Sequence, residues 1–191
     1  MKIYLVRHGQ TDYNLKNLFQ GITDNPLNET GIKQAEELAQ MLKEVKFDVI
    51  FSSPLRRALQ TAEIIRRKNS GNPPIIVDER LREIDMGEWE GKHAPTIKEN
   101  YRELFEEIWK DPFKFNPPGG ERFRDMVERL RSFLNDLKSS DYENVLIVAH
   151  QIVNSALRTL LEGKDWRGFW DNRQKNGEIW VLELKDKEVR A

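Results

Sequence analysis

Cysteine is absent from the 191 residues of this chain. Its absence excludes a disulfide scaffold, a thiolate zinc site, an iron–sulfur cluster and a catalytic cysteine. Histidine is scarce as well, with three residues, and the His-Glu-x-x-His pattern of zinc hydrolases does not occur. We therefore predict that the protein works without a metal ion, and the residues suggest no cofactor.

Long apolar runs and an excess of one charge are also missing. No segment approaches the roughly 18 consecutive apolar residues of a membrane span, and the apolar run at residues 3–6 is too short for the core of a signal peptide. The 31 basic and 32 acidic residues leave a formal charge of −1, which argues against a protein that coats nucleic acid or an anionic membrane. We expect a cytoplasmic protein with no nucleic-acid or membrane partner.

Short apolar runs alternate with helical patterns along most of the chain. Such alternation predicts an α/β protein in which helices cover both faces of a mostly parallel sheet. Asn28 and Thr30 are candidate caps for the first long helix. The strands are predicted at residues 3–6, 47–51, 75–77, 145–149 and 178–184, and the helices at 32–45, from Ser53-Pro54 onward, and at 152–161.

The stretch from about residue 92 to 120 breaks this alternation. It contains no predicted strand, one predicted helix at 96–109 and an aromatic-rich exit that ends in two prolines and two glycines. We interpret it as a small helical and aromatic cap inserted into a single domain of residues 1–191. Its aromatic side chains either contact an apolar or ring-bearing substrate or form a satellite core that holds the cap down.

Two of the three histidines directly follow predicted strands. His8 comes after the first strand, and His150 comes after the strand at 145–149. Ligands of parallel α/β sheets bind at the carboxyl ends of the strands, so this placement favours a functional site over two buried structural histidines. His93 has no such context, and we interpret it as a surface or cap residue.

Arginines point to the same place. Arg7 adjoins His8, and Arg56 and Arg57 fall in the first turn of the helix that follows Ser53-Pro54. A cation at a helix N-terminus opposes the helix dipole, so a site that surrounds an anion explains the pair better than local stability does. We expect one of the two arginines to face solvent.

Glu83 lies among apolar neighbours after the third predicted strand. Partial burial would raise the pKa of its carboxyl group and suit it to donate a proton. Two imidazoles, two arginines, one carboxyl and helix N-terminal N–H groups together predict a site that holds a phosphoryl group, attacks it and protonates the leaving oxygen. Guanidinium groups and N–H dipoles would neutralise the phosphoryl oxygens without a metal.

Four sequence blocks contain the residues described above. They are residues 5–11, 52–62, 81–91 and 145–150, with shorter matches at Asn14, 19–21, 26–31 and 34–35. In this order along the chain, the blocks resemble the histidine phosphatase superfamily, which includes the cofactor-dependent phosphoglycerate mutases. The resemblance covers nearly the whole chain and implies a three-layer α/β/α sandwich, in agreement with the alternation of strands and helices.

The resemblance implies a role for each central residue. His8 becomes the nucleophile that forms a phosphohistidine, and Arg7, Arg57 and His150 become the pocket that grips the phosphoryl oxygens. Glu83 becomes the acid for the leaving alcohol and then the base that activates water. The ligand is then a small phosphorylated metabolite, and inorganic phosphate is a product.

Outer contacts and two departures complete the comparison with the family. Asn14 and the backbone N–H of Gly21 are implied outer phosphate contacts. The family usually has glycine after the second histidine, where this chain has Gln151; the amide either narrows the pocket, reduces activity or adds a contact. Arg122 replaces a common serine, and it either contacts substrate or faces solvent.

The short, aromatic cap favours water over a sugar acid as phosphoryl acceptor, because the mutases have a longer and more basic insertion there. We therefore predict a phosphomonoesterase that resembles the broad-specificity phosphatases and the α-ribazole phosphatases, between which the sequence does not choose. A phosphoglycerate mutase is the alternative, and a non-catalytic phosphoester-binding module is the second. Either a monomer or a homodimer is compatible with the tryptophan-rich C-terminal region.

Overall fold

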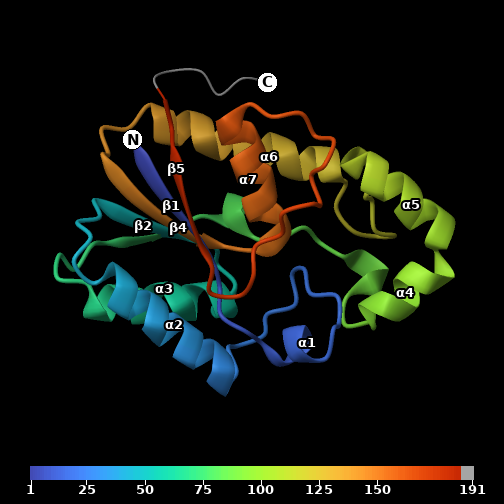
Figure 1. The fold of residues 1–191 in the computed structure, drawn as a ribbon, viewed down its shortest axis with the longest axis horizontal. Coiled ribbons are helices and arrows are strands. Elements are labelled where there is room, and N and C mark those ends of the chain that lie inside the picture. Colours follow the sequence, from blue (N-terminus) through green and yellow to red (C-terminus); the bar gives the residue numbers. More distant parts are fainter. Residues whose placement is uncertain (186–191) are drawn as a thin grey trace.

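Five strands form one sheet at the centre of the computed structural model, which describes residues 1–185 (Figure 1). Their order is β3-β2-β4-β1-β5, and all neighbours run parallel except β1 and β5. The predicted mostly parallel sheet is confirmed, although the second strand starts two residues later than expected. The strands are β1 (Lys2–Arg7), β2 (Val49–Ser52), β3 (Ile75–Val77), β4 (Asn144–Ala149) and β5 (Ile179–Glu183).

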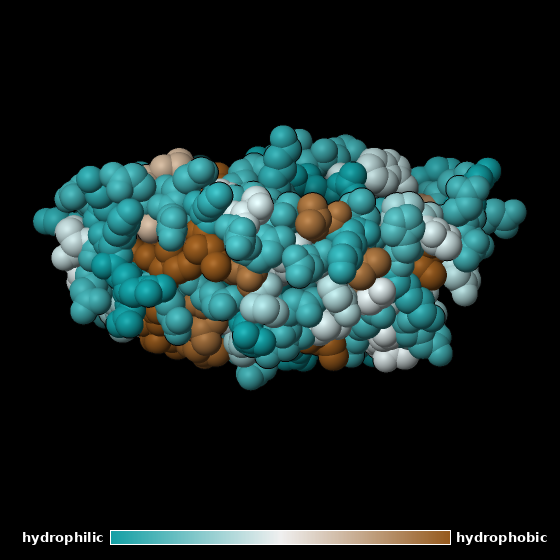
Figure 2. Space-filling view, turned by 90° about the horizontal axis from the view of Figure 1, so that it is seen from below, coloured by the Kyte–Doolittle hydropathy of each residue, from teal (hydrophilic) through white to brown (hydrophobic). Residues whose placement is uncertain are grey.

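Helices cover both faces of this sheet and so make the predicted three-layer sandwich. In Figure 1, α2 and α3 lie below the sheet, and α6 and α7 lie above it. Figure 2 shows the lower side as mostly hydrophilic, with hydrophobic side chains gathered toward one end. The helices are α1 (Asp12–Leu15), α2 (Glu29–Leu42), α3 (Arg56–Lys68), α4 (Ala94–Asn100), α5 (Arg102–Lys110), α6 (Phe123–Lys138) and α7 (Gln151–Glu162).

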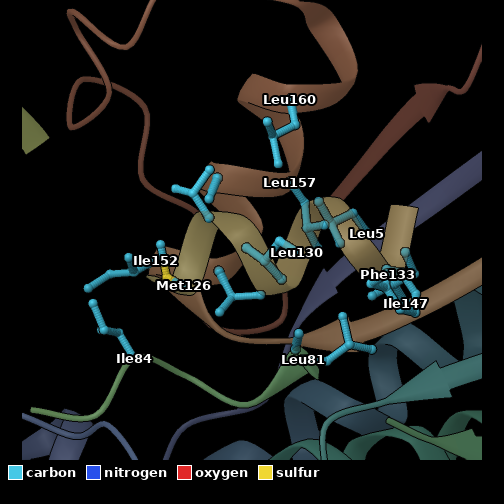
Figure 3. Packing of buried hydrophobic residues seen from close by; sticks show 14 of the residues in the cluster. Leu5, Leu81, Ile84, Met126, Leu130, Phe133, Ile147, Ile152, Leu157 and Leu160 are labelled. Atoms are coloured by element: carbon cyan, nitrogen blue, oxygen red, sulfur yellow. The ribbon is translucent and has the colours of Figure 1, made fainter. Parts of the chain in front are cut away.

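The apolar run of β4 is continuous because both of its faces are buried. Val145 and Ile147 pack into the larger cluster, under α6 and α7 (Figure 3), whereas Leu146 and Val148 pack into the cluster against α2 and α3. Alternate side chains of a strand point to opposite faces, so a run without polar residues is what a doubly covered strand requires.

Helices α2 and α3 have boundaries that differ from the expected ones. Asn28 caps α2 by accepting a hydrogen bond from the N–H of Gly31, so the helix begins three residues early; it also ends three residues early, at Leu42. Helix α3 begins at Arg56 rather than at Ser53-Pro54, and no side chain of its own N-cap residue closes it. Asp24 instead accepts from the N–H of Arg56 at 2.7 Å, which fastens the preceding loop to the start of the helix.

The predicted cap residues contain two helices instead of the single helix expected at 96–109. Tyr101 separates α4 from α5 with φ −120° and ψ 41°. The break lets Ile97 and Ile108 both reach the larger hydrophobic cluster, while the Tyr101 ring packs 5.9 Å from that of Trp89. Among residues 1–185, no helix is both long and apolar enough to cross a membrane.

Candidate active site

The register of the two central strands brings the two histidines together. Arg7 of β1 is paired with Ala149 of β4, so His8 and His150 are the next residues on neighbouring strands. Their ring centroids are 5.1 Å apart. Both imidazoles are buried, with 2% and 1% of their surface exposed. The expectation that two strand ends meet at one site therefore describes this part of the structure correctly.

The His8 imidazole is oriented by its own loop. Its Nδ1 lies 2.6 Å from the carbonyl oxygen of Gly9. Since a carbonyl only accepts, Nδ1 carries the proton in the neutral ring, and the lone pair remains at Nε2. Burial, followed by the charges of Arg57 and Arg7, holds the pKa of His8 well below its usual range. The ring is therefore neutral near neutral pH, with the Nε2 lone pair free of that proton.

Close packing explains why glycine follows this histidine. A Cβ on Gly9 would lie 2.3 Å from the carbonyl oxygen of Gly31 at the start of α2. The Gly9 N–H donates to the Thr61 hydroxyl of α3 at 3.2 Å. The loop that carries His8 is thus held against both helices of one face.

Two arginines surround the histidines, Arg7 half-buried and Arg57 fully buried. Arg7 donates to the carbonyl of Gln174 at 2.9 Å, and the fully buried Arg57 donates to the carbonyls of Gly21 and Thr23. Burial lowers the pKa of each arginine to about 10, so both remain cationic at neutral pH. Their Nε atoms are buried without a hydrogen-bond partner among the described residues, which leaves donors for an anion.

Glu83 lies at the N-terminus of α7. Its Oε2 accepts from the N–H of Ile152 at 2.9 Å, and its Oε1 accepts from the N–H groups of Ile84 and Val153. With Oε2 making one such bond and Oε1 two, a proton is best accommodated on Oε2. Burial raises the pKa of Glu83 above its usual value despite these N–H groups and the nearby Arg57, as its apolar sequence neighbours predict.

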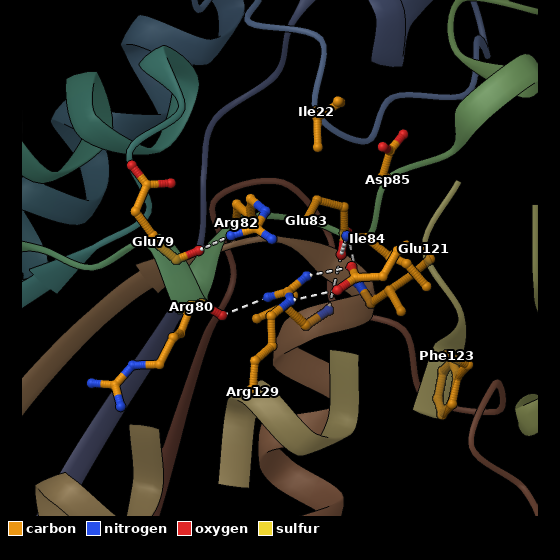
Figure 4. Close-up of polar contacts among 12 residues, drawn as sticks. Ile22, Glu79, Arg80, Arg82, Glu83, Ile84, Asp85, Glu121, Phe123 and Arg129 are labelled. Atoms are coloured by element: carbon orange, nitrogen blue, oxygen red, sulfur yellow. Dashed lines mark hydrogen bonds and ion pairs between the residues drawn. The ribbon is translucent and has the colours of Figure 1, made fainter. Parts of the chain in front are cut away.

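An ion pair between Arg129 and Glu121 fixes the segment that carries Glu83 (Figure 4). Arg129 of α6 forms a bidentate pair with Glu121, with N–O distances of 2.8 and 2.9 Å. Arg129 also donates to the carbonyl of Arg80, and the N–H of Glu121 donates to that of Asp85. The chain is therefore held on both sides of Glu83, by residues that the sequence did not single out as part of the site.

The loop at residues 21–23 connects Arg57 to another carboxylate. Glu90 accepts from the N–H groups of Gly21 and Ile22 at 2.7 and 2.6 Å, and from the Thr23 hydroxyl at 3.1 Å. The implied phosphate contact through the Gly21 N–H is therefore wrong for this structure, because Glu90 occupies that donor. The carbonyl of Gly21 serves the site instead, as an anchor for Arg57.

One cavity of about 590 Å³ joins these groups. Asn14 and Gln151 line it, as predicted, and the Gln151 amide donates to the carbonyl of Gln174 at 3.3 Å. Arg122 does not line it; the exposed guanidinium pairs with Asp125 at 2.9 Å, so of the two expectations for Arg122 solvent exposure is correct. The predicted residues that the cavity brings together are Arg7, His8, Asn14, Arg57, Glu83, His150 and Gln151.

Several functional candidates escaped the sequence analysis. Ser53, which was expected only to open a helix, lies with its hydroxyl 2.7 Å from Nε2 of His150. Lys98 and Arg173 line the outer cavity. Lys98 is one of four lysines scattered over the cap, and nothing in the sequence around Arg173 marks it. Arg56 is exposed, whereas Arg57 is buried, as expected for one of the pair.

The arrangement combines a neutral imidazole, cationic donors and a protonatable carboxyl group in one cavity. Burial, together with the charges of Arg57, His8 and Arg7, also keeps the pKa of His150 well below its usual range. Within residues 1–185 no three His, Asp or Glu side chains are grouped so as to hold a metal ion. Independence from metal remains a prediction.

Comparison with known proteins identifies the family of this chain. A protein of Hydrogenobacter thermophilus, whose name provisionally assigns it as phosphoserine phosphatase 2, is 40% identical over 96% of this chain and 90% of its own. A 2,3-bisphosphoglycerate-dependent phosphoglycerate mutase of Cytophaga hutchinsonii is 35% identical over 83% and 75%. The α-ribazole phosphatase of Shigella flexneri superposes with a TM-score of 0.83 at 31% identity, over 96% and 90%. The family model of the histidine phosphatase superfamily (branch 1) matches residues 3–191, and the chain belongs to that superfamily.

Proposed function

We propose that the protein is a metal-independent phosphomonoesterase that acts on small phosphorylated metabolites through a phosphohistidine on His8. The observation that carries this proposal is a set of buried donors around an oriented imidazole. The Ser53 hydroxyl accepts from the N–H of Leu55, so its own proton can go to Nε2 of His150, which leaves Nδ1 of that ring as a donor. This Nδ1 and the Nε atoms of Arg7 and Arg57 are buried without partners among residues 1–185, and all three residues line the cavity with His8. A buried donor without a partner is costly, and a phosphoryl group would satisfy all three.

The first chemical step transfers the phosphoryl group to the protein. Nε2 of His8 attacks phosphorus, the bond from phosphorus to the ester oxygen breaks, and the proton on Glu83 passes to that oxygen. Arg7 and Arg57 stabilise the charge on the remaining phosphoryl oxygens. The products are a free alcohol, a phosphohistidine and a Glu83 carboxylate.

The second step returns the protein to its starting state. The Glu83 carboxylate removes a proton from water as the water oxygen bonds to phosphorus, and the bond between phosphorus and Nε2 breaks. Inorganic phosphate leaves, and Glu83 is protonated again. The same carboxyl group thus serves as acid and then as base, as its raised pKa favours.

Water is the proposed acceptor for two reasons. The chain matches the two phosphatases compared above over nine-tenths or more of both lengths, but the mutase over 83% and 75%. The cap is also short and aromatic, with Phe105 and Trp109 in the cavity wall. A phosphoglycerate mutase remains the second candidate, because mutases also match over most of the chain.

The test measures phosphate release from phenyl phosphate and from 3-phosphoglycerate, with and without a chelator. A bisphosphoglycerate primer is added so that isomerisation of phosphoglycerate is followed in the same samples, and His8→Ala is the control. We expect chelator-resistant release that His8→Ala abolishes, together with an acid-labile phosphoryl group on the wild-type protein alone.

Other results would contradict the proposal. Isomerisation faster than release would identify a mutase. Phosphate binding without turnover of either substrate would identify a binding module and direct attention to Gln151. Activity lost with the chelator and restored by a divalent cation would disprove independence from metal.

A further inference from the structure

Two cations line the outer cavity away from the strand ends. Lys98 comes from α4, and Arg173 comes from the segment between α7 and β5. Neither forms an ion pair with any of residues 1–185. Both side chains are exposed, and what sets them apart is that they line the same cavity as His8. Two unpaired cations in the wall of one cavity need an explanation.

The two charges act on each other. Burial, and then the positive charge of Arg173, lowers the pKa of Lys98 from its usual value. The Arg173 guanidinium lies 5.9 Å from the ring centroid of Trp109, a contact that orients it against the cap. Like charges repel, so the pair costs stability unless a ligand neutralises it.

The phosphoryl group does not need these cations. Arg7, Arg57 and the two histidines already surround its position, and they come from β1, α3 and the ends of β1 and β4. A cavity of about 590 Å³ is also much larger than one phosphate. The remaining space lies between the strand ends and the cap, where the alcohol part of a phosphoester would extend.

We propose that Lys98 and Arg173 form a subsite for a second anionic group, carried on the alcohol part of the substrate. This inference rests on the proposed function, because it assumes that the first anion is the phosphoryl group beside His8. Phe105, Trp109 and Trp170 line the same cavity, so the part of the alcohol between the two anionic groups would lie against apolar side chains.

The chemistry of the subsite defines a substrate class. A carboxylate or a second phosphate on the alcohol would each satisfy Lys98 and Arg173, whereas a neutral or cationic alcohol would leave them unpaired. Discrimination of this kind arises mainly from the polar groups left unsatisfied in the wrong complex. The protein should therefore prefer phosphoesters that carry an anionic group besides the phosphoryl group over otherwise equal esters.

Matched substrates test this preference. O-phosphoserine is compared with phosphoethanolamine, and phosphotyrosine with phosphotyramine, because each second compound lacks only the carboxylate. Fructose 1,6-bisphosphate and fructose 6-phosphate form the pair that tests a second phosphate. We expect kcat/KM to be at least about tenfold higher for the more anionic member of one of these pairs. A tenfold ratio is what one additional charge-assisted hydrogen bond to the substrate typically gives.

Variants then assign the preference to the two residues. Lys98→Met and Arg173→Gln should each reduce the ratio of kcat/KM within the preferred pair by about tenfold or more, chiefly through KM, and the double variant should abolish it. Lys110→Gln and Arg102→Gln are matched controls, since both side chains are exposed on the same cap and lie outside the cavity wall; they should leave the ratio unchanged.

Binding separates failure of this inference from failure of the proposed function. In a His8→Ala background, calorimetry compares O-phosphoserine with phosphoethanolamine and fructose 1,6-bisphosphate with fructose 6-phosphate, with and without the Lys98 and Arg173 substitutions. Preference for the more anionic compound that the substitutions remove would support the subsite even if the wild-type protein released no phosphate. Equal affinity within each pair, or a preference that survives the double substitution, would overturn it whether or not phosphoesters are hydrolysed.

Discussion

Two adjacent arginines show how finely this site depends on single residues. Arg56 is exposed, whereas Arg57 is buried and donates to the carbonyls of Gly21 and Thr23. A lysine at position 57 would keep the charge but lose the planar fork that reaches two carbonyls and a phosphoryl group at once. We expect Arg57→Lys to lose about 2–3 kcal/mol of transition-state stabilisation. With phenyl phosphate, kcat should therefore fall roughly 30- to 150-fold.

Arg56→Lys is the natural control, because it makes the same exchange one position earlier on the exposed side of α3. It should retain wild-type turnover. Turnover close to wild type in Arg57→Lys, or equal losses in both variants, would remove Arg57 from the proposed role.

The protonation states of two residues set the pH dependence. Activity should rise with pH as His8 loses its proton, because only the neutral imidazole attacks, and should fall as Glu83 ionises, because the carboxylate cannot donate. Burial lowers the pKa of His8 and raises that of Glu83, so the maximum should lie on the acidic side of neutral. The measurement is kcat/KM for phenyl phosphate from acidic to alkaline pH.

The falling limb belongs to Glu83 alone in this scheme. Glu83→Gln should reduce turnover and also remove that limb, since the amide does not titrate. A wild-type rate that continued to rise into alkaline pH would argue against Glu83 as the acid.

Single residues at strand ends were the most predictable part of the site. His8 and His150 follow short apolar runs, and parallel sheets place such positions together. Lys98 and Arg173 were not predictable in the same way, because their proximity depends on how the cap and the segment after α7 pack. The partner of the Gly21 N–H was also mispredicted, since Glu90 is 69 residues away in sequence.

At the scale of elements, the loop at residues 21–23 links two charged side chains that do not touch. Its N–H groups bind the Glu90 carboxylate, and its carbonyls bind Arg57. Glu90→Gln would remove the charge and place an amide donor against N–H donors, so the loop should loosen. We expect phosphate affinity to fall about tenfold, as for loss of a charge-assisted hydrogen bond.

Calorimetric titration with inorganic phosphate measures this effect, and Glu88→Gln on the exposed neighbouring turn is the control. Unchanged phosphate affinity in Glu90→Gln would show that Arg57 does not depend on the loop.

The boundaries of helices and strands were harder to predict than their types, because contacts between residues distant in sequence set the boundaries. Helix α3 starts at Arg56 because Asp24, from a distant loop, accepts from its first N–H. The cap helix breaks at Tyr101 because its two halves face one hydrophobic cluster from different directions. Neither cause is visible in the local pattern of residues.

For the whole molecule, the layered architecture followed from sequence because the pattern alone requires it. A strand such as β4, apolar throughout residues 145–149, needs cover on both faces, and the alternating helices provide it. The sequence left open whether the aromatic residues of the cap face substrate or form a satellite core. The satellite core does not describe the structure, because Phe115 belongs to the larger hydrophobic cluster that the sheet residues also form. Trp109 is 51% exposed and lines the cavity wall, where contact with a substrate stays a prediction.

Because the sheet and the cap share the larger hydrophobic cluster, we expect them to unfold together. Sheet residues, cap residues and Trp170 belong to one cluster, and the Trp170 indole donates to the carbonyl of Ile108 on α5 at 3.0 Å. The cap should therefore unfold with the sheet in a single transition, even though chains of this length often populate intermediates. Trp170→Ala should lower the free energy of unfolding by about 3–5 kcal/mol, whereas Trp109→Ala should cost far less, because half of that side chain is already exposed. Calorimetry and fluorescence on the same samples measure whether the cap and the sheet unfold in one transition. A separate early transition that is larger in Trp170→Ala would mean that the cap is a domain of its own.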